Sequence, residues 1–216
     1  MESLKVASHQ DPPMSKRDSP GLFTTRKSKT KVLWPFMEDW FSRGNLKKRH
    51  IPASVFFSLF FSKSKQNGKL RQILDQSQFN TDVVMPSIVM ETLNEIQKFV
   101  NQVMWATSFD VTDAYLTVPI HESCQKYFCV LLVGKVYMIS RLPLGLTMVP
   151  WVFLQIMRPI KVCIRLRGVQ VNSFLDDFLI LAITSAMCTI HTALTEKLLI
   201  CLGFEINYQK PSLILY

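Results

Sequence analysis

Three aspartates have a residue type and a setting that could support chemistry. Asp176 and Asp177 stand side by side in the otherwise apolar SFLDDFLIL (173–181), and Asp110 stands in SFDVTDAY (108–115). Neighbouring carboxylates repel each other and resist leaving water, so an apolar run is a poor place for them unless something compensates. Two interpretations of the pair stay open: a turn between two strands, or ligands of a divalent cation.

The second acidic cluster favours the cation. Oxygen ligands without nitrogen or sulfur suit Mg²⁺ or Mn²⁺ rather than zinc. Asp110, Asp176 and Asp177 could together hold two such ions, about 3.5–4 Å apart, which would clamp an in-line phosphoryl displacement. Asp113 lies three residues after Asp110. It could belong to the acidic cluster or could instead cap the next element, and the sequence favours neither role.

If the phosphoryl displacement acts on a nucleotide triphosphate, the negative charge of that substrate would need cationic side chains of the protein in addition to the metal ions. Lys63, Lys65, Lys69 and Arg71 line a predicted hairpin, and Arg71 can hold phosphate through two parallel hydrogen bonds. A charged, solvated hairpin face explains them as well. Lys210, in LGFEINYQKP (202–211), could protonate a departing pyrophosphate, although alone it would be an ordinary surface lysine.

The elements that must position these residues mix hairpins and helices, which indicates an α+β fold. Strand-rich 55–61 and 70–74 flank Asn67-Gly68, a strong hairpin signal. Further hairpins are expected at 127–139 and 169–183, and helices at 90–103, 150–166 and 186–202. Residues 108–120 are expected to form a strand that runs into a turn near Asp113 and Pro119. In the last helix the apolar line to be buried is Met187, Ile190, Leu194, Leu198 and Cys201.

Composition narrows the class without choosing it. The chain has 216 residues and a net charge of +9, and eleven of its Lys/Arg fall in residues 1–50, which read as a basic, poorly ordered segment. A basic surplus fits nucleic acid, acidic membranes or plain solubility. Five cysteines without CxxC spacing, and no apolar N-terminal signal, indicate an intracellular protein. Residues 178–195 are uncharged, but their Ser, Thr and His content makes a membrane segment the least favoured reading.

The ordered set of motifs resembles reverse transcriptases. SFDVTDAY, RLPLGLTMVPWVFLQIM (141–157), FLDDFLIL and LGFEINYQKP look like successive palm motifs, and GKLRQILDQSQFN (68–80) looks like a fingers segment of the form G-x-x-R-x-x-x-D-x-x-x-x-N. Two further segments, METL (90–93) and DAY…VPIH (113–121), look most like retrotransposons of the DIRS-like, tyrosine-recombinase group. The resemblance covers about residues 52–215.

The resemblance implies a role for each matching residue. Asp110, Asp176 and Asp177 would bind two Mg²⁺ or Mn²⁺ ions, with Val111 beside them, and Lys210 would close the fourth motif as a catalytic lysine. The nucleotide would meet Lys65 and Arg71 at its triphosphate, backbone amides of Asp113-Ala114, Tyr115 at the sugar's 2′ position, and Leu144-Gly145 at the floor near the 3′-hydroxyl.

It also implies a fold and a function. The expected architecture is the right-hand polymerase fold with fingers (51–105) and palm (106–216), a fingers-like hairpin near 121–142, and an antiparallel palm sheet packed on helices. The expected reaction is transfer of dNTPs to a primer 3′-hydroxyl on an RNA template, with no membrane partner. Because the sequence stops after the fourth motif, the thumb and RNase H regions are expected in a longer product, if anywhere. The alternative is a catalytically inactive nucleic-acid-binding remnant of a decayed retroelement.

Overall fold

The computed structural model describes residues 27–48, 55–64, 70–88, 90, 104–132 and 135–208. The chain divides into two compact units that interleave along the sequence. Unit 1 comprises Met1–Met85 and Val118–Val149, and unit 2 comprises Pro86–Thr117 and Pro150–Tyr216. The predicted helix at 90–103 falls almost wholly outside the described residues.

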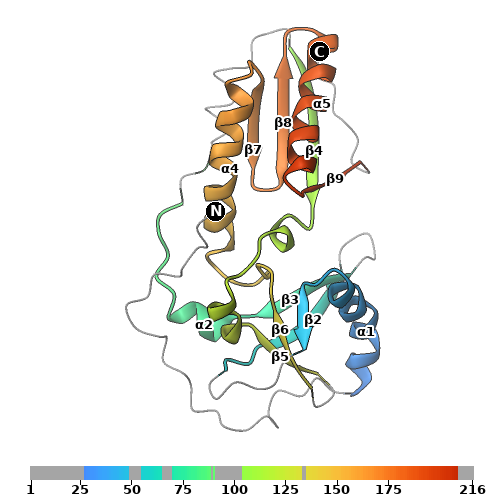
Figure 1. Cartoon of the computed structure of the whole chain (residues 1–216), viewed down its shortest axis with the longest axis vertical. Helices are drawn as coiled ribbons and strands as arrows, with labels where there is room; N and C mark the ends of the chain where they lie inside the picture. The colour runs from blue at the N-terminus through green and yellow to red at the C-terminus, as the bar shows by residue number, and fades with distance from the viewer. Residues whose placement is uncertain are drawn as a thin grey trace. The chain divides into compact units, whose positions relative to one another are not determined.

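Unit 1 is built from short strands, one longer helix, α1, and two short helical segments (Figure 1). A three-stranded antiparallel sheet has the order β1-β6-β5, and β2 pairs with β3 in a separate hairpin. Its elements are α1 (Lys27–Ser42), β1 (Leu46–Lys48), β2 (Leu59–Ser64), β3 (Leu70–Asp75), α2 (Ser77–Thr81), η3 (Glu122–Tyr127), β5 (Cys129–Leu132) and β6 (Lys135–Ile139). The hairpins expected around Asn67-Gly68 and Gly134-Lys135 are confirmed by the β2–β3 and β5–β6 pairings.

Aromatic packing holds unit 1 together. Phe79 of α2 lies with its ring 5.6–5.7 Å from the rings of three partners, Phe56, Tyr127 and Phe128. Trp40 of α1 meets Phe60 of β2 edge-on at 5.4 Å. Such edge-on and tilted contacts stabilise a core beyond the area they bury.

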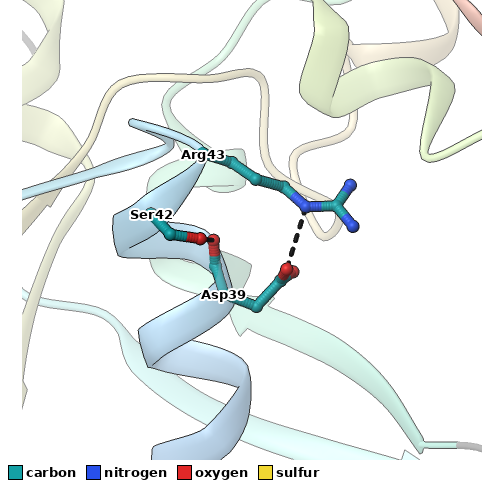
Figure 2. Close-up of polar contacts among 3 residues, drawn as sticks. All are labelled: Asp39, Ser42 and Arg43. Atoms are coloured by element: carbon teal, nitrogen blue, oxygen red, sulfur yellow. Dashed lines mark hydrogen bonds and ion pairs between the residues drawn. The ribbon is translucent and has the colours of Figure 1, made fainter.

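Helix α1 lies within the basic segment 1–50 and ends in local polar contacts (Figure 2). Arg43 Nε donates to Asp39 Oδ1 at 2.9 Å, and Ser42 Oγ donates to the Asp39 carbonyl at 2.8 Å. Gly44 then turns the chain with a φ of 70°, a conformation that glycine adopts without strain. The turn leads into β1, which pairs with β6.

Unit 2 is a four-stranded antiparallel sheet with helices packed on it (Figure 1). The strand order is β7-β8-β4-β9, and α5 contacts β8, β4 and β9. Its elements are β4 (Trp105–Thr112), η2 (Ala114–Thr117), α4 (Val149–Arg165), β7 (Gln170–Phe174), β8 (Asp177–Ala182), α5 (Ser185–Cys201) and β9 (Glu205–Asn207). The hairpin and both helices predicted for this region are therefore confirmed, and the fold is α+β.

The predicted inner face of α5 is wrong. Met187 and Ile190 are 43% and 62% exposed, whereas Cys188, Thr195 and Leu199 are buried. Thr107 Oγ1 of β4 lies 3.2 Å from Cys188 Sγ, which fixes the face that meets the sheet. An apolar pattern does not register Thr195, because its hydroxyl is polar. Thr195 can nevertheless be buried, because its Oγ1 donates to the His191 carbonyl within the helix.

The uncharged run 178–195 is shared between two elements, β8 and α5. Over the described part of the chain, no helix combines the length and the apolarity needed to cross a membrane. All five cysteines lie in described residues and are free thiols. Burial raises the pKa of the Cys129 thiol to about 12, so this thiol stays protonated at neutral pH.

Candidate active site

One row of residues crosses the whole sheet of unit 2. Phe174 of β7 is paired with Asp177 of β8, Asp177 with Asp110 of β4, and Asp110 with Asn207 of β9. Directly opposed residues in antiparallel strands share a face, with Cβ atoms about 4.5–5.5 Å apart. These four residues form what is here termed the acid row, with two carboxylates at its centre.

The other face of the same strands is apolar. Phe109 and Phe178 stack in parallel with ring centroids 5.3 Å apart, and Val111 is 2% exposed. Because side chains alternate along a strand, burial of Phe109 and Val111 directs Asp110 to the opposite face. Asp110 is half-buried and Asp177 is exposed. The buried apolar neighbours of the aspartates therefore hold the acid row in place.

Asp176 lies in the two-residue turn that joins β7 to β8. Its carbonyl oxygen accepts a hydrogen bond from Val111 N at 3.0 Å, so β4 is bonded to the turn just beyond the acid row. Leu175, the other turn residue, has a φ of 55°. A branched or bulky side chain rarely adopts this left-handed region, which marks the turn as strained.

The donors fit a hard divalent cation in their chemistry. Asp110, Asp176 and Asp177 offer only oxygen, the ligand that Mg²⁺ and Mn²⁺ prefer. Asp110 and Asp177 are brought together by register, and Asp176 adjoins them through the turn. Among the described residues no three His, Cys, Asp or Glu side chains already converge as a metal cluster.

The segment after β4 presents Asp113, Ala114 and Tyr115. Asp113 has a φ of 46°, which aspartate tolerates better than most residues, and its carbonyl accepts from Leu116 N at 2.8 Å to start η2. Ala114 is buried. The half-buried Tyr115 ring meets Phe153 of α4 edge-on at 5.2 Å, and Phe153 is itself backed by Phe204. Tyr115 is thus oriented by an edge-on contact with buried aromatic rings.

Leu144 and Gly145 lie in unit 1, against β3. The Leu144 carbonyl accepts from Leu74 N at 3.2 Å. Gly145 has a φ of 116°, and a Cβ added there would overlap the Leu74 carbonyl oxygen. Only glycine lets the loop approach the strand this closely. β3 also carries Arg71, whose backbone is paired with Lys63 of β2.

Two of the predicted site residues, Lys65 and Lys210, lie outside the described residues. The structure in turn draws attention to two asparagines that had no role from sequence. Asn207 completes the acid row, and Asn80 binds the loop of Gly145. Both stand in the quoted motifs, so their place in the motif spacing was the available signal.

Comparison with known proteins assigns the chain to a family. The family model for reverse transcriptase (RNA-dependent DNA polymerase) matches residues 62–215. The chain belongs to the reverse transcriptase family. It is 26% identical over 156 residues to the Gag-Pol polyprotein of Walleye dermal sarcoma virus, covering 71% of this chain and 9% of that polyprotein.

Solved reverse transcriptases share the fold. A foamy viral protease–reverse transcriptase in complex with double-stranded DNA matches with a TM-score of 0.79 and 18% identity, over 100% of this chain and 36% of that one. The native prototype foamy virus protease–reverse transcriptase matches with a TM-score of 0.79 and 17% identity, over 99% of this chain and 27% of that one. The expected α+β polymerase fold is therefore confirmed, and the chain spans only a part of the length of these relatives.

Proposed function

We propose that this chain carries the fingers and palm of an RNA-directed DNA polymerase, which adds dNTPs to the 3′-hydroxyl of a primer. The observation that carries the proposal is the acid row: Asp110 and Asp177 are cross-strand partners, with Asp176 in the adjoining turn. The row lies inside the region matched to the reverse transcriptase family.

Asp110, Asp176 and Asp177 would hold two Mg²⁺ or Mn²⁺ ions, with Val111 contributing through its backbone. Bound divalent ions would stabilise the charge that develops as the primer oxygen attacks the α-phosphate and pyrophosphate departs. The strands themselves supply rigidity, because the stacked Phe109 and Phe178 hold β4 and β8 in register beneath the two carboxylates.

The other proposed contacts recognise the nucleotide. Tyr115, braced by Phe153, would stand against the 2′ position and exclude ribonucleotides by bulk. Backbone amides of Asp113 and Ala114 would meet the phosphates at the start of η2. Leu144 and Gly145 would form the floor near the 3′-hydroxyl.

Cationic residues would hold the triphosphate and release its product. Arg71, on β3, offers two parallel hydrogen bonds to phosphate, and Lys65 would assist it. Lys210 would donate the proton that the departing pyrophosphate requires.

The proposed partners are an RNA template and a DNA primer. The net charge of +9 favours a nucleic-acid backbone, and the foamy viral relative is described in complex with double-stranded DNA. A hybrid of A-like form would be recognised by shape and charge rather than by base sequence. Within the family, the sequence segments 90–93 and 113–121 favour a retrotransposon of the DIRS-like group.

Primer extension tests the proposal. The purified chain would be given a primed RNA template, a labelled dNTP, and Mg²⁺ or Mn²⁺. We expect incorporation by the unaltered chain, and a loss of at least about 100-fold in Asp176→Asn and Asp177→Asn, because each removes a charged metal ligand. Asp82→Asn, an exposed aspartate that ends α2, is the matched control and should extend normally.

Unchanged melting temperatures would show that these near-isosteric changes spare the fold. Equal incorporation by the Asp176, Asp177 and control variants would contradict the assigned chemistry. Failure of the unaltered chain to incorporate at any metal concentration would overturn the polymerase proposal. If that chain still bound the primed template, the inactive nucleic-acid-binding remnant would be the function to adopt.

A further inference from the structure

Asn80 connects two segments of unit 1 that are far apart in sequence. Its side-chain Nδ2 donates to the Gly145 carbonyl at 2.9 Å, 65 residues along the chain. Its Oδ1 accepts from Thr147 N at 3.0 Å and lies 3.2 Å from Thr147 Oγ1. One amide group thus binds the loop on both sides of Leu146, using its donor and its acceptor together.

This arrangement is selective for asparagine. The loop offers a carbonyl oxygen at Gly145 and an N–H at Thr147, so the side chain needs a donor and an acceptor at fixed separation. Aspartate would supply only the acceptor, and serine is too short to reach both. A side chain that merely fills space would not need this pairing.

The loop so held packs against the strand of the proposed triphosphate ligand. Leu74 N donates to the Leu144 carbonyl, and Gly145 leaves no space for a side chain against Leu74. Leu74 lies three residues after Arg71 on β3. The backbone contact and the Asn80 bonds therefore fix the Leu144–Gly145 loop relative to the Arg71 strand.

The spacing of Arg71, Asp75 and Asn80 in the fingers motif follows from the elements on which these residues lie. Arg71 lies on β3, and Asp75 ends that strand, where its Oδ1 accepts from Ser77 N at 3.0 Å as α2 begins. One helical turn later the Asn80 backbone N donates to the Gln76 carbonyl, which orients the side chain toward the loop. The strand, the short helix and the loop are linked by consecutive hydrogen bonds.

We propose that Asn80 is a positioning residue for the incoming nucleotide: it holds the Leu144–Gly145 floor at a fixed place beside the Arg71 strand. Asn80 acts through the loop and does not itself contact substrate. This inference rests on the proposed function, because it assumes that Arg71 and the loop bind a dNTP.

Equilibrium binding of dTTP with Mg²⁺, measured by calorimetry on the full chain, tests the role. We expect Asn80→Ala to weaken binding about tenfold, as the loss of these hydrogen bonds would leave the floor unfixed. Asn80→Asp should weaken binding at least as much, because a carboxylate oxygen in place of Nδ2 would repel the Gly145 carbonyl oxygen. Thr81→Ala is the matched control and should bind normally, since Thr81 Oγ1 donates within α2, to the Gln78 carbonyl.

Amide hydrogen exchange supplies a readout that needs no nucleotide. The Thr147 N–H should exchange faster in Asn80→Ala than in Thr81→Ala, because its acceptor is gone. Thr147→Val, which removes one hydroxyl from the same contact, keeps the test usable if Asn80→Ala fails to fold, and should weaken dTTP binding by a smaller factor.

The outcomes distinguish the positioning role of Asn80 from the polymerase proposal. If the unaltered chain binds dTTP and Asn80→Ala or Thr147→Val binds it equally well, the positioning role is overturned while the polymerase proposal stands. Unchanged exchange of the Thr147 amide would overturn it too. If the unaltered chain binds no dTTP at any Mg²⁺ concentration, the nucleotide-binding assignment itself fails and the positioning role falls with it.

Discussion

At the scale of single residues, the turn beside the acid row has an unusual backbone. Leu175 adopts a φ of 55° between Phe174 and Asp176, where a two-residue hairpin turn ordinarily employs glycine or asparagine. The hydrogen bond from Val111 N to the Asp176 carbonyl holds the turn against this preference. Strain of this kind persists only where the surroundings impose it, and here they place an aspartate at the sheet's end.

Substitutions at Leu175 should reveal that strain. We expect Leu175→Val to be less stable than Leu175→Asn by about 1 kcal/mol, because asparagine tolerates the left-handed region and a β-branched residue does not. Apolar burial alone would order the two variants the other way. Urea unfolding of both proteins measures the difference, and a more stable valine variant would show that the turn is not strained.

At the scale of elements, α5 shows that apolar spacing does not by itself identify a buried face. Thr184 caps the start of the helix, where its hydroxyl accepts from Met187 N at 3.2 Å, and the helix ends before Gly203, which has a φ of 90°. Both ends follow common capping rules and were readable in advance. Its inward residues were not, because the sheet contacts Cys188, Thr195 and Leu199 instead of the stronger apolar line.

Two alanine substitutions in α5 distinguish the faces. Leu199→Ala, at a fully buried side chain, should lower the free energy of unfolding by about 3 kcal/mol through lost burial and a residual cavity. Ile190→Ala, at a side chain that is 62% exposed, should change it by no more than about 0.5 kcal/mol. Chemical denaturation of the two variants is the measurement. A larger loss at Ile190 would contradict the observed orientation of the helix.

At the scale of the whole molecule, the two units are interleaved in sequence. The chain enters unit 2 at Pro86, returns to unit 1 at Val118, and leaves it again after Val149. The acid row belongs to unit 2, while the Arg71 strand and the Gly145 loop belong to unit 1. The residues proposed for the site are therefore divided between the two units in sequence.

Net charge is also a property of the whole molecule, and it predicts how the affinity for nucleic acid depends on salt. With a net charge of +9, the chain should lose at least about tenfold of its affinity for a primed RNA–DNA hybrid between about 50 mM and about 200 mM salt, because counterions compete for the backbone. Fluorescence anisotropy measures this. A hybrid of scrambled sequence should give the same affinity and slope. Binding that ignores salt would contradict a backbone-directed contact.

Much of the local structure was predictable, for local reasons. The Asn67-Gly68 dipeptide in the sequence predicted the β2–β3 hairpin, and the acid pair predicted the turn of the β7–β8 hairpin, since turn chemistry depends on neighbours in sequence. The helical spacing of residues 150–166 puts five apolar side chains on one side of the predicted helix: Val152, Phe153, Ile156, Met157 and Ile160. In α4 Val152, Phe153 and Met157 are buried, and Ile156 and Ile160 are half-buried. A 3.6-residue period identifies the buried face of a helix well when each successive helical turn carries a large apolar residue on that face.

By itself, the sequence determined which residues could do chemistry: three aspartates in apolar settings, an arginine on a hairpin, and motifs in the order of a reverse transcriptase. Only the tertiary structure decided that Asp177 lies opposite Asp110, that Asn207 extends their row, and that Asn80 binds the loop of Gly145. The reason is physical. Strand register and hydrogen bonds across some 65 residues depend on how separate elements assemble, and local preferences do not specify that assembly.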